Sequence, residues 1–262
     1  MIKFFRKIRY NLMSENKTGS SAETSVKAGK YLKYAIGEIL LVVLGILIAL
    51  QINNWNQERI NKARSIGYMK SLVEDIKSDI VQYNINIESY TTDINNNKRL
   101  FINDDYKMLN ADSIIKLVSG FYMINKTTRQ TYEKIKNAGL IESLGTDATN
   151  KAVNDYYSLE NVYYENLLQW DKENMVKDYN FWFYNNNFES SSVRDYNTNN
   201  LPFLESAEKR KADLIKLIES TQGRNHLRGA IIRHEHTRKR VKEIMAYAEK
   251  LIELLNTELN SK

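Results

Sequence analysis

Three histidines lie close together near the C-terminal end of the chain, and they are its best candidates for metal binding or proton transfer. His226, His234 and His236 fall within eleven residues, with Glu235 among them. On a helix, His234 and His236 would point about 200° apart, so the pair cannot chelate one ion. The chain has no cysteine, which excludes thiolate chemistry and Cys-based metal sites. We therefore predict no metal site and no cofactor.

Arg238 is the second candidate, because it falls on an apolar helical seam, where an unpaired charge would be costly. Seven lysines and arginines lie between Arg224 and Lys242, on all sides of the expected helix. Pairing with acidic residues of a helix over 66–94 is the simpler explanation for most of them. The alternative is a polar core or ligand site at His234 and Arg238.

Enzyme motifs are otherwise almost absent from the chain. There is no phosphate-binding Walker loop, no dinucleotide-binding glycine pattern and no H-E-x-x-H motif. Ser113 and Lys116 match the serine–lysine motif of penicillin-binding enzymes, and residues 17–19 match another part of that set. These two matches stand in the reverse order, on opposite sides of an expected membrane span. We expect no catalysis.

Two long heptad patterns predict the helices that would position these residues. The first recurs in steps of three and four from Ile66 to Ile94, and the second does so from Leu227 to Leu259. Shorter helices are expected after a cap at Asp112, between a capping box at Thr127 and Gln130 and an end at Gly139, from Asp147 onward, and over 207–218. Residues 185–202 are polar and aperiodic, which predicts an exposed loop.

An apolar run near the N-terminus sets the domain organisation. Residues 39–50 are twelve consecutive apolar residues, extended on both sides and flanked by Tyr31, Tyr34 and Trp55. Such a run is long enough for one membrane-spanning helix. We predict an all-α protein in three parts: a basic tail over 1–33, an anchor over 34–55 and a soluble antiparallel helical bundle, elongated and similar to a coiled coil, over 56–262.

The excess positive charge of the chain lies entirely in the tail. Residues 1–33 carry eight basic and two acidic side chains, a net charge of +6, whereas residues 34–262 carry thirty of each. A neutral soluble domain lacks the electrostatic footprint of nucleic-acid binding. A basic tail beside a span instead suits anionic lipid headgroups and a cytoplasmic location. The first thirteen residues have the pattern either of an interfacial helix or of a disordered basic tail.

One face of the expected anchor has the residue types of a contact with a partner helix. Gly45 and Ala49 form a pair of small residues four apart, which permits close helix approach, and Leu41 lies on nearly the same face. Glu38 lies seven residues before Gly45, and ionisable groups within a span are often functional. The simpler alternative is that Glu38 favours the helix N-terminus and extends toward the interface.

The sequence YAIGEILLVVLGILIALQINNWNQER, with the preceding MIKFFRKIR and NKTG, resembles an uncharacterised family of single-pass membrane-anchored proteins in Bacteroidota. TYEKIKNAGLIESL is similar to a segment in the soluble part of that family. This chain carries an insert, SSAETSVKAG, that the family pattern usually lacks. The resemblance implies a Gram-negative inner membrane and a periplasmic domain, and it implies no activity.

We therefore expect a membrane-anchored interaction or scaffold module of the bacterial envelope. Its partners would be membrane lipid and either a second copy of the chain or another envelope protein, with no nucleic acid and no known small-molecule substrate. The alternative is a periplasmic ligand-sensing bundle that acts through a partner protein, because a tail of 33 residues is too short for an output domain.

Overall fold

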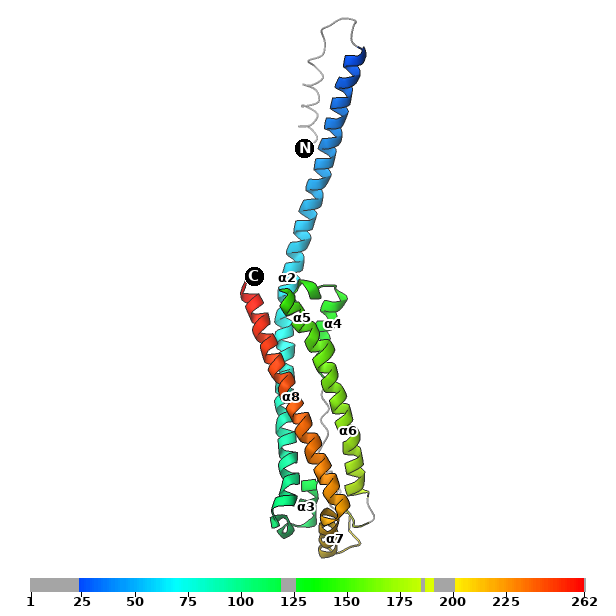
Figure 1. Ribbon diagram of the computed structural model, residues 1–262, viewed down its shortest axis with the longest axis vertical. Coiled ribbons are helices and arrows are strands. Elements are labelled where there is room, and N and C mark those ends of the chain that lie inside the picture. Colours follow the sequence, from blue (N-terminus) through cyan, green and yellow to red (C-terminus); the bar gives the residue numbers. More distant parts are fainter. Residues whose placement is uncertain (1–23, 119–125, 185–186, 191–200, 262) are drawn as a thin grey trace. The chain divides into compact units, whose positions relative to one another are not determined.

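The computed structural model describes residues 24–118, 126–184, 187–190 and 201–261. Every secondary-structure element of the described residues is a helix and none is a strand, which confirms the predicted all-α class. The chain divides into two units, residues 1–59 and 60–262, and each is described here by itself. Figure 1 shows the long helices that build the second unit.

The apolar run lies in the first unit, within helix α2 (Thr24–Ile102). Its large apolar side chains, from Ile36 to Ile52, are between 45 % and 63 % exposed. Among the described residues this helix is the one long and apolar enough to cross a membrane, judged by length and composition. An 18-residue window of it has a mean hydropathy of 2.5, and none of that window is buried.

Three long helical segments build the second unit: α2 from Ile60 onward, α6 (Asn161–Phe183) and α8 (Thr221–Ser261). Helix α8 runs antiparallel to α2, since Lys98 pairs with Glu235 at 2.6 Å and Arg224 bonds to the Leu100 carbonyl. It also runs antiparallel to α6. Helices α2 and α6 therefore run parallel (Figure 1).

The core of the second unit contains two apolar clusters. The larger one is rich in tyrosine and packs α2 against α5 (Asp147–Asp155), α6 and the C-terminal half of α8. The smaller one surrounds Trp182 at the other end of the bundle, where α3 (Ala111–Val118) and α7 (Ala207–Glu219) meet α8. Both heptad patterns contribute buried residues to these clusters, as their spacing predicts.

Local signals explain two helix ends, and a long-range contact holds a third. Helix α4 (Gln130–Asn137) ends at Gly139, whose φ of +66° is a conformation that glycine adopts without strain. Asn110 caps α3, because its Oδ1 accepts the Ser113 N–H at 2.8 Å. The first turn of α5 is held from α8, where Glu258 Oε1 accepts the Thr146 N–H at 2.6 Å. Short 3₁₀ turns over Asp105–Met108 and Ile141–Ser143 complete the connections.

The structure differs from the expected capping residues at two places. Asn110 rather than Asp112 caps α3. The expected capping box before α4 does not form, because Thr127 donates to Glu165 at 3.1 Å and both N–H and hydroxyl of Thr128 donate to Asp79. Long-range acceptors on α2 and α6 thus replace the local cap.

A π-helical turn over Tyr156–Glu160 joins α5 to α6. Such turns insert an extra residue into a helix and shift the face that its side chains present. Tyr156 and Tyr157 of this turn are both fully buried. The expected loop over 185–202 lies largely outside the described residues, and Phe188 within it is buried in the smaller cluster.

Candidate functional site

A stripe of polar side chains runs along the buried face of α2 in the second unit. Its members are spaced by three, four or seven residues, so they share one helical face. All of them are at most 3 % exposed: Asp79, Tyr83, Asn86, Tyr90 and Asn97. Burying so many polar groups is tolerable only where each is hydrogen-bonded.

Partners from α6 and the π-helical turn meet this stripe. The Tyr156 hydroxyl donates to Asp79 Oδ2 at 3.0 Å. The Tyr83 hydroxyl lies 3.1 Å from the Tyr156 hydroxyl. One turn further on, Asn86 Nδ2 donates to the Tyr164 hydroxyl at 2.7 Å. Burial raises the pKa of Asp79, although the hydrogen bonds from Thr128 and Tyr156 oppose this shift.

Arg233 of α8 is buried and lies at the centre of a network of charged side chains. Its Nε donates to Asp171 Oδ1 at 2.7 Å, and its Nη2 donates to Asp178 Oδ2 at 2.8 Å. Both carboxylates come from α6, one of them completely buried. One guanidinium thus bridges two acids seven residues apart, an arrangement that lysine cannot copy with a single nitrogen.

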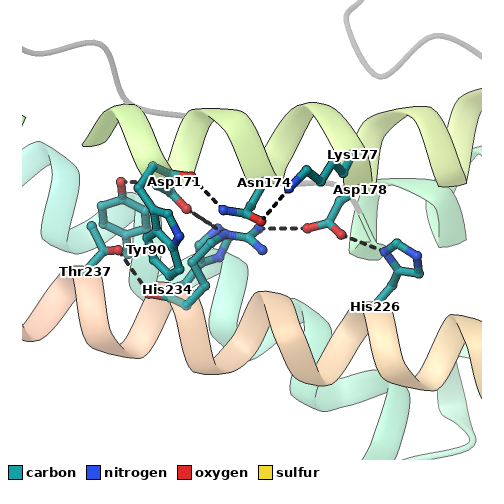
Figure 2. A network of polar contacts seen from close by, with 10 residues as sticks. Tyr90, Asp171, Asn174, Lys177, Asp178, His226, His234 and Thr237 are labelled. Carbon is teal, nitrogen blue, oxygen red and sulfur yellow. Dashed lines mark hydrogen bonds and ion pairs between the residues drawn. The ribbon is translucent and has the colours of Figure 1, made fainter. Parts of the chain in front are cut away.

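Two further side chains complete the network from opposite ends. The Tyr90 hydroxyl donates to Asp171 Oδ2 at 2.9 Å, and His226 Nδ1 lies 2.8 Å from Asp178 Oδ1. Burial, reinforced by Asp171, raises the pKa of Tyr90, so this hydroxyl stays protonated and donating. Figure 2 shows the network extending from Tyr90 on α2 across α6 to His226 on α8.

His234 lies beside this network and is only 2 % exposed. Its ring packs against Tyr90 with 5.3 Å between centroids, and its Nε2 lies 3.7 Å from Asp171 Oδ1, too far for a hydrogen bond. Among the residues that the structure describes, neither ring nitrogen has a hydrogen-bond partner. Burial lowers the pKa of His234 to about 4, so the imidazole is neutral near pH 7.

A small cavity adjoins His234. It is lined by polar groups of Asn97 and Asp178 and by apolar side chains that include Met175 and Trp182. Its volume is about 10 Å³, which is room for one water molecule at most. A metabolite does not fit beside His234, and no group of three or more His, Asp or Glu side chains is placed to hold a metal within the described parts of the chain.

The structure places Arg238 apart from this network. Arg238 is half-buried, and its Nη1 donates to Thr91 Oγ1 of α2 at 3.2 Å. Arg233, which the sequence pattern did not single out, is the buried cation of this network, and its acids lie on α6 rather than on residues 66–94. A signal for this pairing exists, because His226, Arg233 and Arg240 recur every seven residues, as Asp171 and Asp178 do.

The residues expected to contact a partner helix lie in the first unit. Glu38, Leu41, Gly45 and Ala49 are all exposed on α2. A Cβ atom placed on Gly45 would meet no atom within 4 Å. The described part of the unit therefore leaves this face open to lipid or to another helix.

These observations define an all-α protein with an exposed apolar helix and a bundle held by a buried polar network. The chain belongs to a family of unknown function, DUF6090, whose model matches residues 38–225. The match begins inside the apolar run and includes Asp171 and Asp178, whereas Arg233 and His234 lie beyond it. No curated protein and no solved structure shows significant similarity to the chain.

Proposed function

We propose that this chain is a membrane-anchored helical interaction module of the bacterial envelope. The observation that carries the proposal is the uncovered apolar segment of α2, where large side chains are about half exposed on all sides of the helix. Exposing this apolar surface to water would cost a free energy of roughly 25 cal/mol for each Å². A lipid bilayer covers it on every side, which a single protein partner does not.

The distribution of charge supports an orientation for this anchor. The tail before the span carries the net charge of +6, and short basic tails are retained in the cytoplasm. The second unit would then lie in the periplasm, anchored in the inner membrane. The resemblance of the N-terminal segment to anchored proteins of Bacteroidota supports the same location.

The chemistry of the bundle core supports interaction rather than catalysis. Asp171 and Asp178 both bind Arg233, so these two acids and this buried arginine neutralise one another. The space beside His234 holds no more than a water molecule. We infer that the network fixes the register of α2, α6 and α8, as buried polar groups do in other helical assemblies.

A fusion experiment tests the anchor and its orientation. Alkaline phosphatase fused after Lys262 should be active in intact cells, and green fluorescent protein at the same position should be dark. The fusion protein should stay in the membrane pellet after alkaline carbonate extraction. Leu44→Arg with Leu47→Arg should release it, because each arginine costs about 2.5–3.5 kcal/mol at the centre of a span. A fusion that is fluorescent in the cytoplasm, or wild-type protein extracted by carbonate, would overturn the proposal.

In-cell crosslinking followed by mass spectrometry tests the interaction itself. A module of this kind should give one dominant product, either with a second copy or with one other envelope protein. Crosslinks spread over unrelated abundant proteins would contradict a dedicated interaction.

A further inference from the structure

Helix α6 exposes more large apolar side chains to solvent than α8 does. Seven such residues on α6 and the turns at its ends are at least 40 % exposed: Leu159, Val162, Tyr163, Trp170, Val176, Tyr179 and Tyr184. By contrast, Ile232 is the one large apolar side chain exposed to this degree among the described residues of α8. An interaction surface needs exposed apolar groups that are contiguous, so the residues that share one face of α6 are the relevant ones.

Two of these residues are aromatic rings on the same face of α6. Tyr163 is 50 % exposed and Trp170 is 45 % exposed. They are seven residues apart, which is two helical turns or about 10 Å along the axis. Asn166 lies between them on nearly the same face and carries an exposed amide. A hydrogen-bonding group thus lies between the two rings, in contrast to the continuous apolar stripe of a helix–helix contact.

Helix α8 supplies the opposite wall of a groove. Tyr163 lines it together with His236, Lys239, Arg240 and Glu243, around an open volume of about 370 Å³. That volume lies within the usual range for ligand sites. His236 also meets Trp170 edge-on, with 6.4 Å between ring centroids, so both rings border the same side of α8.

The charges in the groove favour an anionic ligand. Arg240 lies over the Tyr163 ring, 4.6 Å from its centroid, and is paired with Glu160 and Glu243. These pairs hold the guanidinium in place and consume both acids. Lys239 is exposed and has no acidic partner among the residues that the structure describes. Lys239 therefore remains as an unneutralised cation in the groove.

We propose that the groove between α6 and α8 binds a linear glycan of β-linked, N-acetylated sugars that carries carboxylates. Sugar rings present an apolar face of C–H groups that packs on exposed aromatic rings, and alternate sugars of such a chain recur at about the spacing of Tyr163 and Trp170. The amide of Asn166 suits acetamido and hydroxyl groups, and Lys239 suits a carboxylate. In a bacterial envelope this chemistry belongs to the cell-wall polymer.

The identification of the glycan as the cell-wall polymer is the one step that rests on the envelope location proposed above. The groove is a property of the second unit by itself, so its binding can be measured on purified protein whatever the topology of the anchor. A wrong topology would leave the binding intact, and failed binding would leave the anchor intact.

Co-sedimentation of the full chain in detergent with purified peptidoglycan sacculi tests the inference. The wild type should sediment with sacculi and, more weakly, with chitin, which has the same linkage but no carboxylates. Trp170→Ala and Tyr163→Ala should each weaken both interactions about tenfold, as expected for one lost aromatic contact. Lys239→Gln should weaken binding to sacculi and leave binding to chitin unchanged.

Tyr184→Ala is the matched control, because Tyr184 is exposed at the end of α6, beyond the groove. It should sediment as the wild type does. Helical circular dichroism of each variant separates lost binding from lost folding. The inference is overturned if the wild type sediments with neither polymer. It is also overturned if Trp170→Ala and Tyr163→Ala bind as well as the control Tyr184→Ala. It is also overturned if polyglutamate displaces sacculi while Trp170→Ala has no effect, which would identify an acidic protein segment as the ligand.

Discussion

Arg233 binds two carboxylates of one neighbouring helix because the two acids are seven residues apart and therefore share one face of that helix. Asp171 and Asp178 are separated by two turns of α6, and the guanidinium reaches both with nitrogen atoms of one planar group. Removing one member of such a buried pair leaves a charge uncompensated, at a cost of about 3–5 kcal/mol. The network thus selects one register between α6 and α8.

His234 gives this network a measurable dependence on pH. Burial lowers its pKa from 6.5 to about 4, with Asp171, Arg233 and Asp178 as the facing charges and the Tyr90 ring beside it. As the pH falls, the unfolded chain takes up the proton first. The stability that neutral His234 contributes is therefore present above pH 6.5 and is lost as the pH falls through about 4.

We predict that the wild type loses about 3 kcal/mol more than His234→Gln when the pH is lowered across this window. Urea unfolding of the full chain in detergent, at about pH 7 and about pH 4, measures the difference. The raised pKa of Asp79 acts in the opposite direction, but it is common to both proteins and cancels. Equal losses of stability in the two proteins would show that burial does not lower the pKa of His234.

At the scale of elements, glycines show where helix packing leaves no room for a side chain. Gly223 lies in the first turn of α8, and a Cβ atom there would approach the Leu217 carbonyl oxygen to 2.1 Å. That oxygen belongs to the end of α7, so the corner between α7 and α8 depends on glycine. Gly229 lies two turns further along α8, where a Cβ atom would meet nothing within 4 Å.

These two positions make a matched pair on one helix. Gly223→Ala should destabilise the protein by about 1–3 kcal/mol, because the corner must open to admit the methyl group. Gly229→Ala should stabilise it by about 1 kcal/mol through helix propensity. Thermal unfolding followed by circular dichroism compares both variants with the wild type. Shifts of the melting temperature in the same direction would contradict the packing at this corner.

At the scale of the whole molecule, the open face of the anchor offers a route to association. Glu38, Leu41, Gly45 and Ala49 lie on one side of α2, and nothing described lies within 4 Å of a Cβ atom at Gly45. Small residues four apart allow a second helix to approach closely. We propose this face as the contact within the membrane.

Gly45→Leu and Glu38→Leu should each weaken a detergent-resistant association while leaving membrane insertion intact. Val43→Leu is the control, because Val43 lies on the opposite side of the helix from Gly45. Crosslinking in detergent measures the yield of the associated species. If both test variants crosslink to the same products at the wild-type yield, the span serves only as an anchor, and any partner binds the second unit.

The sequence by itself determined the apolar run, the all-α class and the two long heptad patterns, because these depend on residues close together in the chain. Gly139 at the end of α4 is readable for the same reason, since a left-handed residue there is a local requirement. Composition likewise confined the excess charge to the tail.

Only the tertiary structure decided which helices meet. A heptad shows that residues share a face, but a helix packed against two neighbours buries a wider stripe than one seam. The buried stripe of α8 therefore extends to Arg233 and Thr237 on one side and leaves Arg238 half-buried on the other. Whether α8 meets acids on α2 or on α6 depends on how those two parallel helices are placed beside it, which contacts between distant residues decide. That placement puts Asp171 and Asp178, separated from Arg233 by more than fifty residues, within reach of its guanidinium.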